Sequence, residues 1–201
     1  MNPNILSPKK AVNSCFEKPN WAIALSLVFV SFLFWAGQAF VISGSLEMDS
    51  ALFGLATSYI GFFALGIIIL VIGFVFNRQA IKGKFSGLFS ALSLLQIIFI
   101  LVYILSIIAF YLVIPSGVAA ELRAVDGTIL ESSARFNEVL LANAASINFM
   151  LLYGFLVLAA IVGLYGFCIL VLAVKKFTDS GTIGALLISL VSAILLGFLG
   201  L

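Results

Sequence analysis

The stretch NRQAIKGKFSGLFSAL, residues 77–92, decides the fold because it is a short polar break between two long apolar runs. Charge-free sequence covers residues 50–77 before the break and residues 85–120 after it. Each run exceeds the roughly 20 apolar residues that a helix needs to cross a bilayer core of about 30 Å. The break holds three basic residues and no acid. It therefore predicts a cytoplasmic turn between two transmembrane helices.

The rest of the chain repeats this pattern. Hydrophobic residues make up 64% of the 201 residues and charged residues 9%, whereas soluble domains are about one quarter charged. Further charge-free runs cover residues 19–46, 139–174 and 180–201. They are continuous, unlike the short alternating strands of a membrane barrel. We therefore predict one all-α, polytopic domain over residues 21–201, a bundle of five transmembrane helices at about 21–43, 52–76, 86–114, 147–174 and 182–200.

The charges between these helices predict the orientation of the bundle. Eight of the ten basic residues and two of the eight acids fall on the side that holds residues 1–20, 77–85 and 175–181, a net charge of +6. The other side, which includes the loop 115–146, carries two basic residues and six acids, a net charge of −4. Because cytoplasmic loops are rich in Lys and Arg, we expect a cytoplasmic amino terminus and a carboxyl terminus outside.

Residues 1–20 read as a short amphipathic helix that lies in the cytoplasmic membrane interface. Ser7 can cap this helix and Pro8 fits its first position. Ala11, Val12, Cys15 and Phe16 then share one face. The side chains expected to anchor the segment at the membrane surface are Lys9, Lys10, Phe16, Lys18 and Trp21. A disordered basic tail is the alternative interpretation.

The start of the third span carries two faces. Phe85, Leu88, Phe89 and Leu92 recur at helical spacing on one of them. Ser86, Ser90 and Ser93 form a serine stripe on another, with Gly83 and Gly87 close by in the sequence. We predict that the first two turns sit in the cytoplasmic interface and pack through the serine stripe.

Small residues at helical spacing mark two other spans. Gly54, Ser58 and Gly61 align on the second span, and Ala159, Gly163 and Gly166 align on the fourth. Such faces let helix backbones approach closely. Packing within one chain and dimerisation would both leave this pattern. A surface helix is also expected from Ser132 onward, continuing into the fourth span.

Residues for catalysis are missing from the predicted spans. The spans contain no Asp, Glu, Lys, Arg or His, and the chain has no His at all. Proton relays, ion-coupled transporters and intramembrane proteases normally rely on such residues, and no phosphate loop or CxxC pattern occurs. We therefore expect no catalytic, cofactor or metal site and no enzyme. The net charge of +2 is too small to predict a nucleic acid partner.

Three stretches of the chain resemble the prokaryotic branch of the Yip family of five-span membrane proteins. The first lies before the first span (Asn2-Pro3, Ser7-Pro8-Lys9-Lys10-Ala11 and Glu17-Lys18-Pro19-Asn20), the second at the entrance to the third span (Lys82-Gly83-Lys84-Phe85-Ser86 to Ser90-Ala91-Leu92) and the third at the entrance to the last (Ser180-Gly181-Thr182-Ile183-Gly184-Ala185). The prolines usual in the family's third and last spans are absent, as is the aspartate–leucine–tyrosine–glycine–proline motif of eukaryotic members. The resemblance implies a non-catalytic, five-span protein with a cytoplasmic amino terminus in the cell membrane of a prokaryote. Because the eukaryotic motif is absent, a Rab partner cannot be carried over from the family.

Two functions fit these observations. The first is a non-enzymatic integral membrane protein that organises membrane, self-associates or recruits protein partners through its cytoplasmic face. The alternative is a small permease or an auxiliary subunit of a transporter. Its support is the set of polar side chains within the spans, notably the amides Gln38, Gln96 and Asn148.

Overall fold

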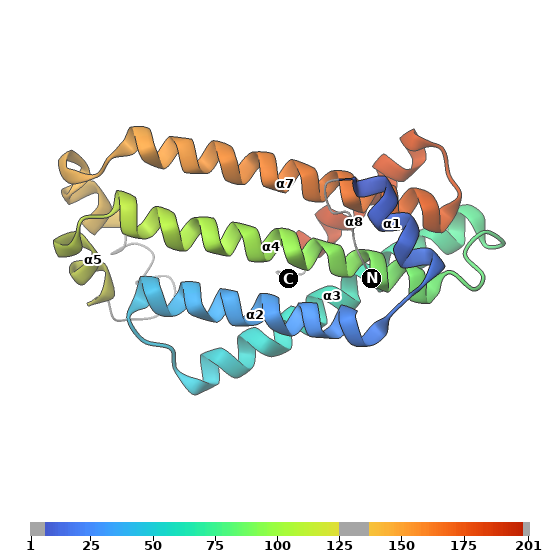
Figure 1. The fold of residues 1–201 in the computed structure, drawn as a ribbon, viewed down its shortest axis with the longest axis horizontal. Helices are drawn as coiled ribbons and strands as arrows, with labels where there is room; N and C mark the ends of the chain where they lie inside the picture. The colour runs from blue at the N-terminus through green and yellow to red at the C-terminus, as the bar shows by residue number, and fades with distance from the viewer. Residues whose placement is uncertain (1–6, 125–136, 199–201) are drawn as a thin grey trace.

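A computed structural model describes residues 7–124 and 137–198, and these residues form helices and no strands (Figure 1). The elements are α1 (Pro8–Glu17), α2 (Trp21–Ser43), α3 (Met48–Asn77), α4 (Phe85–Val113), α5 (Ser116–Arg123), η1 (Ala144–Ser146), α7 (Phe149–Thr178) and α8 (Thr182–Phe198). Residues 137–142 are also helical. Four helices, α2, α3, α4 and α7, are long and apolar enough to cross a membrane, and α8 is a shorter apolar helix. The predicted all-α, polytopic membrane fold is confirmed.

Helix α4 is the centre of the bundle. In Figure 1 it runs between α7 and α2, with α8 behind, while α3 starts below α2 and then passes behind these helices. Helix α1 crosses the bundle at one end, where residues 78–84 and 179–181 also lie. We call this the α1 end. Helix α5 lies at the opposite end, which we call the α5 end.

The tightest packing lies at the α1 end. Every residue of α4 from Gly87 to Gln96 is buried, on all faces of the helix. Side chains from α1, α2, α3, α7 and α8 join this core. Towards the α5 end α4 and α7 line a half-open cavity of about 710 Å³. The bundle is therefore closely packed at one end and open between two of its helices at the other.

Short helices that the sequence interpretation did not separate lie at the α5 end. Helix α5 follows Pro115 directly and packs Val118 and Leu122 against Phe110 of α4. Its Arg123 donates two hydrogen bonds, of 3.1 and 3.0 Å, to the carbonyl of Val41 at the end of α2. A cation at the carboxyl end of a helix is favourable because the free carbonyls there carry partial negative charge.

The predicted surface helix is described only from residue 137, and residues 132–136 lie outside the described part. It does not continue into the fourth span, so that expectation is wrong. The 3₁₀ turn of η1 and the two residues Ile147 and Asn148 separate the helix at 137–142 from α7. The Asn148 side chain caps α7 by accepting a hydrogen bond of 3.0 Å from the N–H of Leu151.

Two predicted boundaries also move. Helix α3 begins at Met48 rather than near residue 52, and its first turn includes Asp49, whose negative charge is favourable at a helix amino terminus. Helix α7 continues to Thr178, beyond the predicted 174, and holds Lys175 and Lys176 in its last turn. Charged residues extend these helices beyond their apolar segments. The end of the last predicted span, 199–200, lies outside the described residues.

Candidate functional site

The candidate site is the α1 end of the bundle, where α1 is docked on the transmembrane helices. Ala11, Val12 and Cys15 are at most 3% exposed and belong to the main core. They pack against α4 and α7. The predicted helix is therefore present, but its apolar face contacts protein. Ser7 precedes the helix without making a side-chain cap hydrogen bond, so the predicted cap is wrong and Pro8 alone favours the start.

Phe16 lies directly on Gly87 of α4. A Cβ atom built on Gly87 would lie 2.5 Å from Cδ1 and 3.0 Å from Cα of Phe16. Since the second atom is backbone, a side-chain rotation could not relieve the contact. A glycine at position 87 is what allows α1 to approach α4 this closely.

The serine stripe holds the connection between α1 and α2. Oγ of Ser90 accepts a hydrogen bond of 2.7 Å from the N–H of Asn20, and Oγ of Ser86 accepts one of 3.2 Å from Nε1 of Trp21. Ser93 is 3% exposed and donates to the carbonyl of Ser90 at 2.8 Å. Two of the three serines therefore fix the start of α2 against α4.

The residues expected to anchor the segment at the membrane surface divide into two groups. Lys9, Lys10 and Lys18 are exposed. Phe16 and Trp21 instead contact α4, where the Trp21 ring stacks on Phe89 with a centroid distance of 5.1 Å. The aromatic residues act in packing, and only the lysines face outward.

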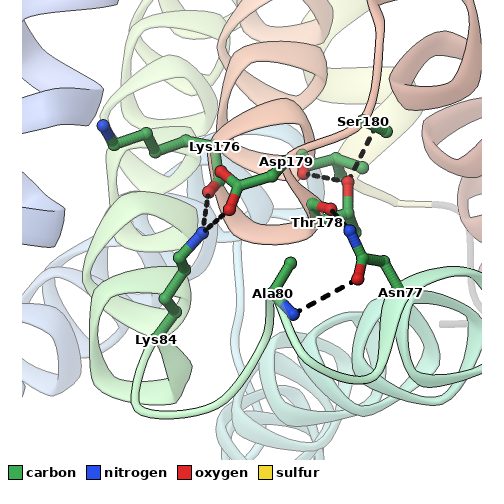
Figure 2. A network of polar contacts seen from close by, with 8 residues as sticks. Asn77, Ala80, Lys84, Lys176, Thr178, Asp179 and Ser180 are labelled. Carbon is green, nitrogen blue, oxygen red and sulfur yellow. Dashed lines mark hydrogen bonds and ion pairs between the residues drawn. The ribbon is translucent and has the colours of Figure 1, made fainter.

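A polar network joins the two loops of the α1 end (Figure 2). Nζ of Lys84 forms an ion pair with Asp179 at 2.5 Å and donates to the carbonyl of Lys176 at 3.2 Å. Nδ2 of Asn77 donates to the carbonyl of Thr178 at 3.1 Å. The sequence interpretation missed these contacts. The available signal was that Asp179 is one of only two acids on the basic side.

Replacing Asp179 with Asn should lower the free energy of unfolding by less than about 1 kcal/mol, because ion pairs exposed to solvent contribute little. The Asp179 side chain is 57% exposed. Replacing Thr178 with Val should cost more, about 1–3 kcal/mol, since the buried Thr178 hydroxyl bonds both Val174 and Ser180 at 2.8 Å. Thermal melting of both variants in detergent tests this order. A larger loss for Asp179→Asn than for Thr178→Val would contradict it.

The small residues of α3 are used within the chain. A Cβ atom on Gly54 would lie 2.2 Å from Cζ3 of Trp35, so α2 approaches α3 over this glycine. Ser58 donates to the Gly54 carbonyl at 2.7 Å. Gly61 lines a cavity between α2, α3 and α4.

The small residues of α7 differ in what they contact. A Cβ atom on Gly166 would lie 3.0 Å from Ile98 of α4. A Cβ atom on Gly163 would have no contact within 4 Å from the other helices that the structure describes. Ala159 lines the larger cavity. The predicted face on α7 therefore does not act as one unit.

Two further close contacts between helices were missed. Gly66 of α3 faces Phe89 of α4, with 2.2 Å between a built Cβ and Cζ of the ring. Gly73 faces Thr178 of α7 at 3.0 Å. Both glycines stand in the apolar run of α3, where Gly66 follows Ser58 by eight residues and Gly73 follows by fifteen. An extended search for small residues at helical spacing could have found them.

Gly83 has a conformational role. Its φ of +75° lies in the left-handed region, and no contact from the described residues lies within 4 Å of a built Cβ. Since side chains disfavour that φ, glycine here allows the turn between α3 and α4. It is not a packing contact between helices.

The three amides that suggested a permease lie in different places. Gln38 lines the larger cavity between α4 and α7. Gln96 lines the smaller cavity between α2, α3 and α4, and Asn148 caps α7. These side chains do not line one common path.

The described residues hold little reactive chemistry. No group of three or more His, Cys, Asp or Glu side chains among them could bind a metal ion. Burial raises the pKa of Cys15 from 9.0 to about 11. Since the thiolate is the reactive form, burial makes the Cys15 thiol less reactive at neutral pH than a free cysteine.

Comparison of the chain with protein-family models, curated proteins and solved structures finds no match. The site is therefore interpreted from its own geometry.

Proposed function

We propose that this integral membrane protein is non-enzymatic and Yip-like, and that it organises membrane or recruits partners through the face at its α1 end. The observation that carries the proposal is the docking of α1 on α4 and α7. Because its apolar face is buried in the core, the helix holds its lysines at a fixed place beside the loops 78–84 and 179–181.

The basic side chains of this face support the proposal. Seven of them are exposed and lack an ion pair within the described residues: Lys9, Lys10, Lys18, Arg78, Lys82, Lys175 and Lys176. Basic side chains at a membrane surface each attract anionic lipid with about 1 kcal/mol. The same charge excess favours a cytoplasmic location for this face in a prokaryotic cell membrane.

The Yip-like part of the proposal rests on the three stretches of sequence that resemble the family. Two of them, Lys82 to Leu92 and Ser180 to Ala185, enter α4 and α8 from the α1 end. The stretch before the first span includes α1 and the turn at Asn20. The three segments that resemble the family therefore meet at one face. This arrangement supports a surface for partners or lipid that this chain would share with the family.

The test compares wild-type protein with the triple variant Lys9→Gln, Lys10→Gln, Lys18→Gln in liposomes that contain phosphatidylglycerol. We expect wild-type protein to collect fluorescent phosphatidylglycerol around itself and to alter vesicle shape. The Gln variant should lose several-fold of the lipid enrichment, because three of the seven unpaired cations are gone. Energy transfer to the labelled lipid and electron cryomicroscopy of the vesicles supply the two measurements.

The matched control replaces the same three lysines with Arg, which retains the charge and should retain the enrichment. High salt should lower the lipid enrichment by both wild-type protein and this control, since it screens exposed charges. If wild-type protein neither enriches the lipid, reshapes vesicles, self-associates nor retains a partner that depends on these lysines, the proposed function is wrong.

A further inference from the structure

The smaller cavity lies inside the membrane-spanning part of the bundle, between α2, α3 and α4. Its volume is about 390 Å³, within the range of about 300–1,000 Å³ that is usual for small-molecule sites. Much of the wall is aromatic and comes from all three helices: Trp35, Phe62, Phe99 and Tyr103. Helix bundles commonly bind ligands in such spaces.

Polar side chains without partners face this cavity. Gln96 is only 8% exposed, and its amide makes no hydrogen bond within the described residues. Ser31 is 4% exposed and its hydroxyl is equally unpaired there, as is the hydroxyl of Tyr103. In hydrocarbon an unpaired amide is costly. A buried amide that shares a cavity with two free hydroxyls indicates that a polar group completes it.

The lining also limits the chemistry of the occupant. No charged side chain among residues 7–124 and 137–198 lines the cavity, so a charged ligand would lose its hydration without compensation. The amide of Gln96 offers both donors and an acceptor, and the rings favour an aromatic or apolar body. The complementary ligand is small and neutral, with an apolar ring and one head that both donates and accepts hydrogen bonds.

We propose that the α2–α3–α4 cavity is a binding site for a small uncharged amphiphile of this class, oriented by Gln96. Ser31 and Tyr103 supply further hydrogen bonds, and Trp35 and Phe99 contact the ring. The site is separate from the basic face at the α1 end. It therefore does not depend on the function proposed for that face.

Trp35 reports on the site directly, because the chain has only two tryptophans. The Trp21→Phe variant leaves Trp35 as the only indole and keeps at position 21 an aromatic ring that can pack on Phe89 of α4. This protein in liposomes is titrated with 4-bromobenzamide, whose bromine quenches a nearby indole. We expect saturable quenching. 4-Bromobenzoate, the charged analogue, should bind at least tenfold more weakly.

The side-chain test is Gln96→Met, which keeps the length of the side chain and removes its hydrogen bonds. It should weaken the binding of 4-bromobenzamide about tenfold, the effect of losing a hydrogen-bonding group in a buried site. Gln38→Met, in the other cavity, is the matched control and should bind 4-bromobenzamide as tightly as the Trp21→Phe protein does. Ser31→Ala should weaken binding about threefold to tenfold and covers the case in which Gln96→Met misfolds.

Three results would overturn the proposal. Quenching that rises linearly with probe concentration and is unchanged in Gln96→Met and Ser31→Ala would mean partition into lipid only. Equal saturable quenching by the amide and by the benzoate would contradict the neutral class. Chemical cross-linking between two chains that Gln96→Met abolishes, without saturable quenching, would assign the amide to a second copy of this chain.

Discussion

Replacing Gly87 with Leu is expected to release α1 from α4 and to expose Cys15. The leucine side chain would occupy the place of the Phe16 ring and backbone, since a Cβ atom alone lies 3.0 Å from the Phe16 Cα. Once α1 moves, the thiol loses the burial that raises its pKa from 9.0 to about 11. Its thiolate fraction at pH 8 then rises about a hundredfold, because each unit of pKa is a factor of ten.

The measurement is the rate at which a water-soluble maleimide labels Cys15 at pH 8 in proteoliposomes. Cys168, the other cysteine of the chain, is exposed and is replaced with Ala in every variant. We expect labelling at least a hundred times faster in Gly87→Leu than in the parent. The matched control is Gly163→Leu on α7, where no other described helix comes within 4 Å of a built Cβ.

The pH dependence of labelling provides a second check. In the parent the folded state favours the neutral thiol, so labelling should stay slow until the pH approaches about 11. In Gly87→Leu it should rise through the ordinary range near 9. Equal rates in Gly87→Leu and the parent across this range would mean that Gly87 does not control the docking of α1.

The sequence predicted α1 closely because its start and end depend on local signals. Pro8 fits the first position of a helix, and the observed helix covers Pro8–Glu17. What contacts Ala11, Val12 and Cys15 depends on where α4 and α7 stand, and no local signal carries that information. An apolar face on a short helix looks the same whether lipid or protein covers it.

The serine stripe could be predicted from the sequence and the polar network could not, for the same reason. Helical spacing alone placed Ser86, Ser90 and Ser93 on one face, and two of them bond the start of α2. The contact of Lys84 with Asp179 joins residues 95 positions apart. It exists because α3 and α7 end at the same side of the bundle. Charge counting groups such residues on one side but does not pair them.

A valine at Gly66 is expected to destabilise the core more than any change at the exposed glycines. A built Cβ lies 2.2 Å from Cζ of Phe89. The Phe89 ring cannot move away easily, because it is 1% exposed and lies 5.1 Å from the Trp21 ring and 5.5 Å from the Phe62 ring. Overpacking of this kind costs about 1–3 kcal/mol. Gly154→Val is the control, since in the described part of the chain no contact lies within 4 Å of a Cβ built on Gly154.

Shortening Phe89 to Leu should rescue Gly66→Val, because the clash involves the far end of the ring. Alone, Phe89→Leu should also destabilise the protein, since it removes ring contacts that join α4 to α2 and α3. The double variant should therefore lose less than the two single losses together, with a coupling of about 0.5–3 kcal/mol, as for residues in contact. Unfolding of the four proteins in mixed micelles measures it. Additive losses would show that Gly66 and Phe89 act independently, and α3 would then be held to α4 by other contacts.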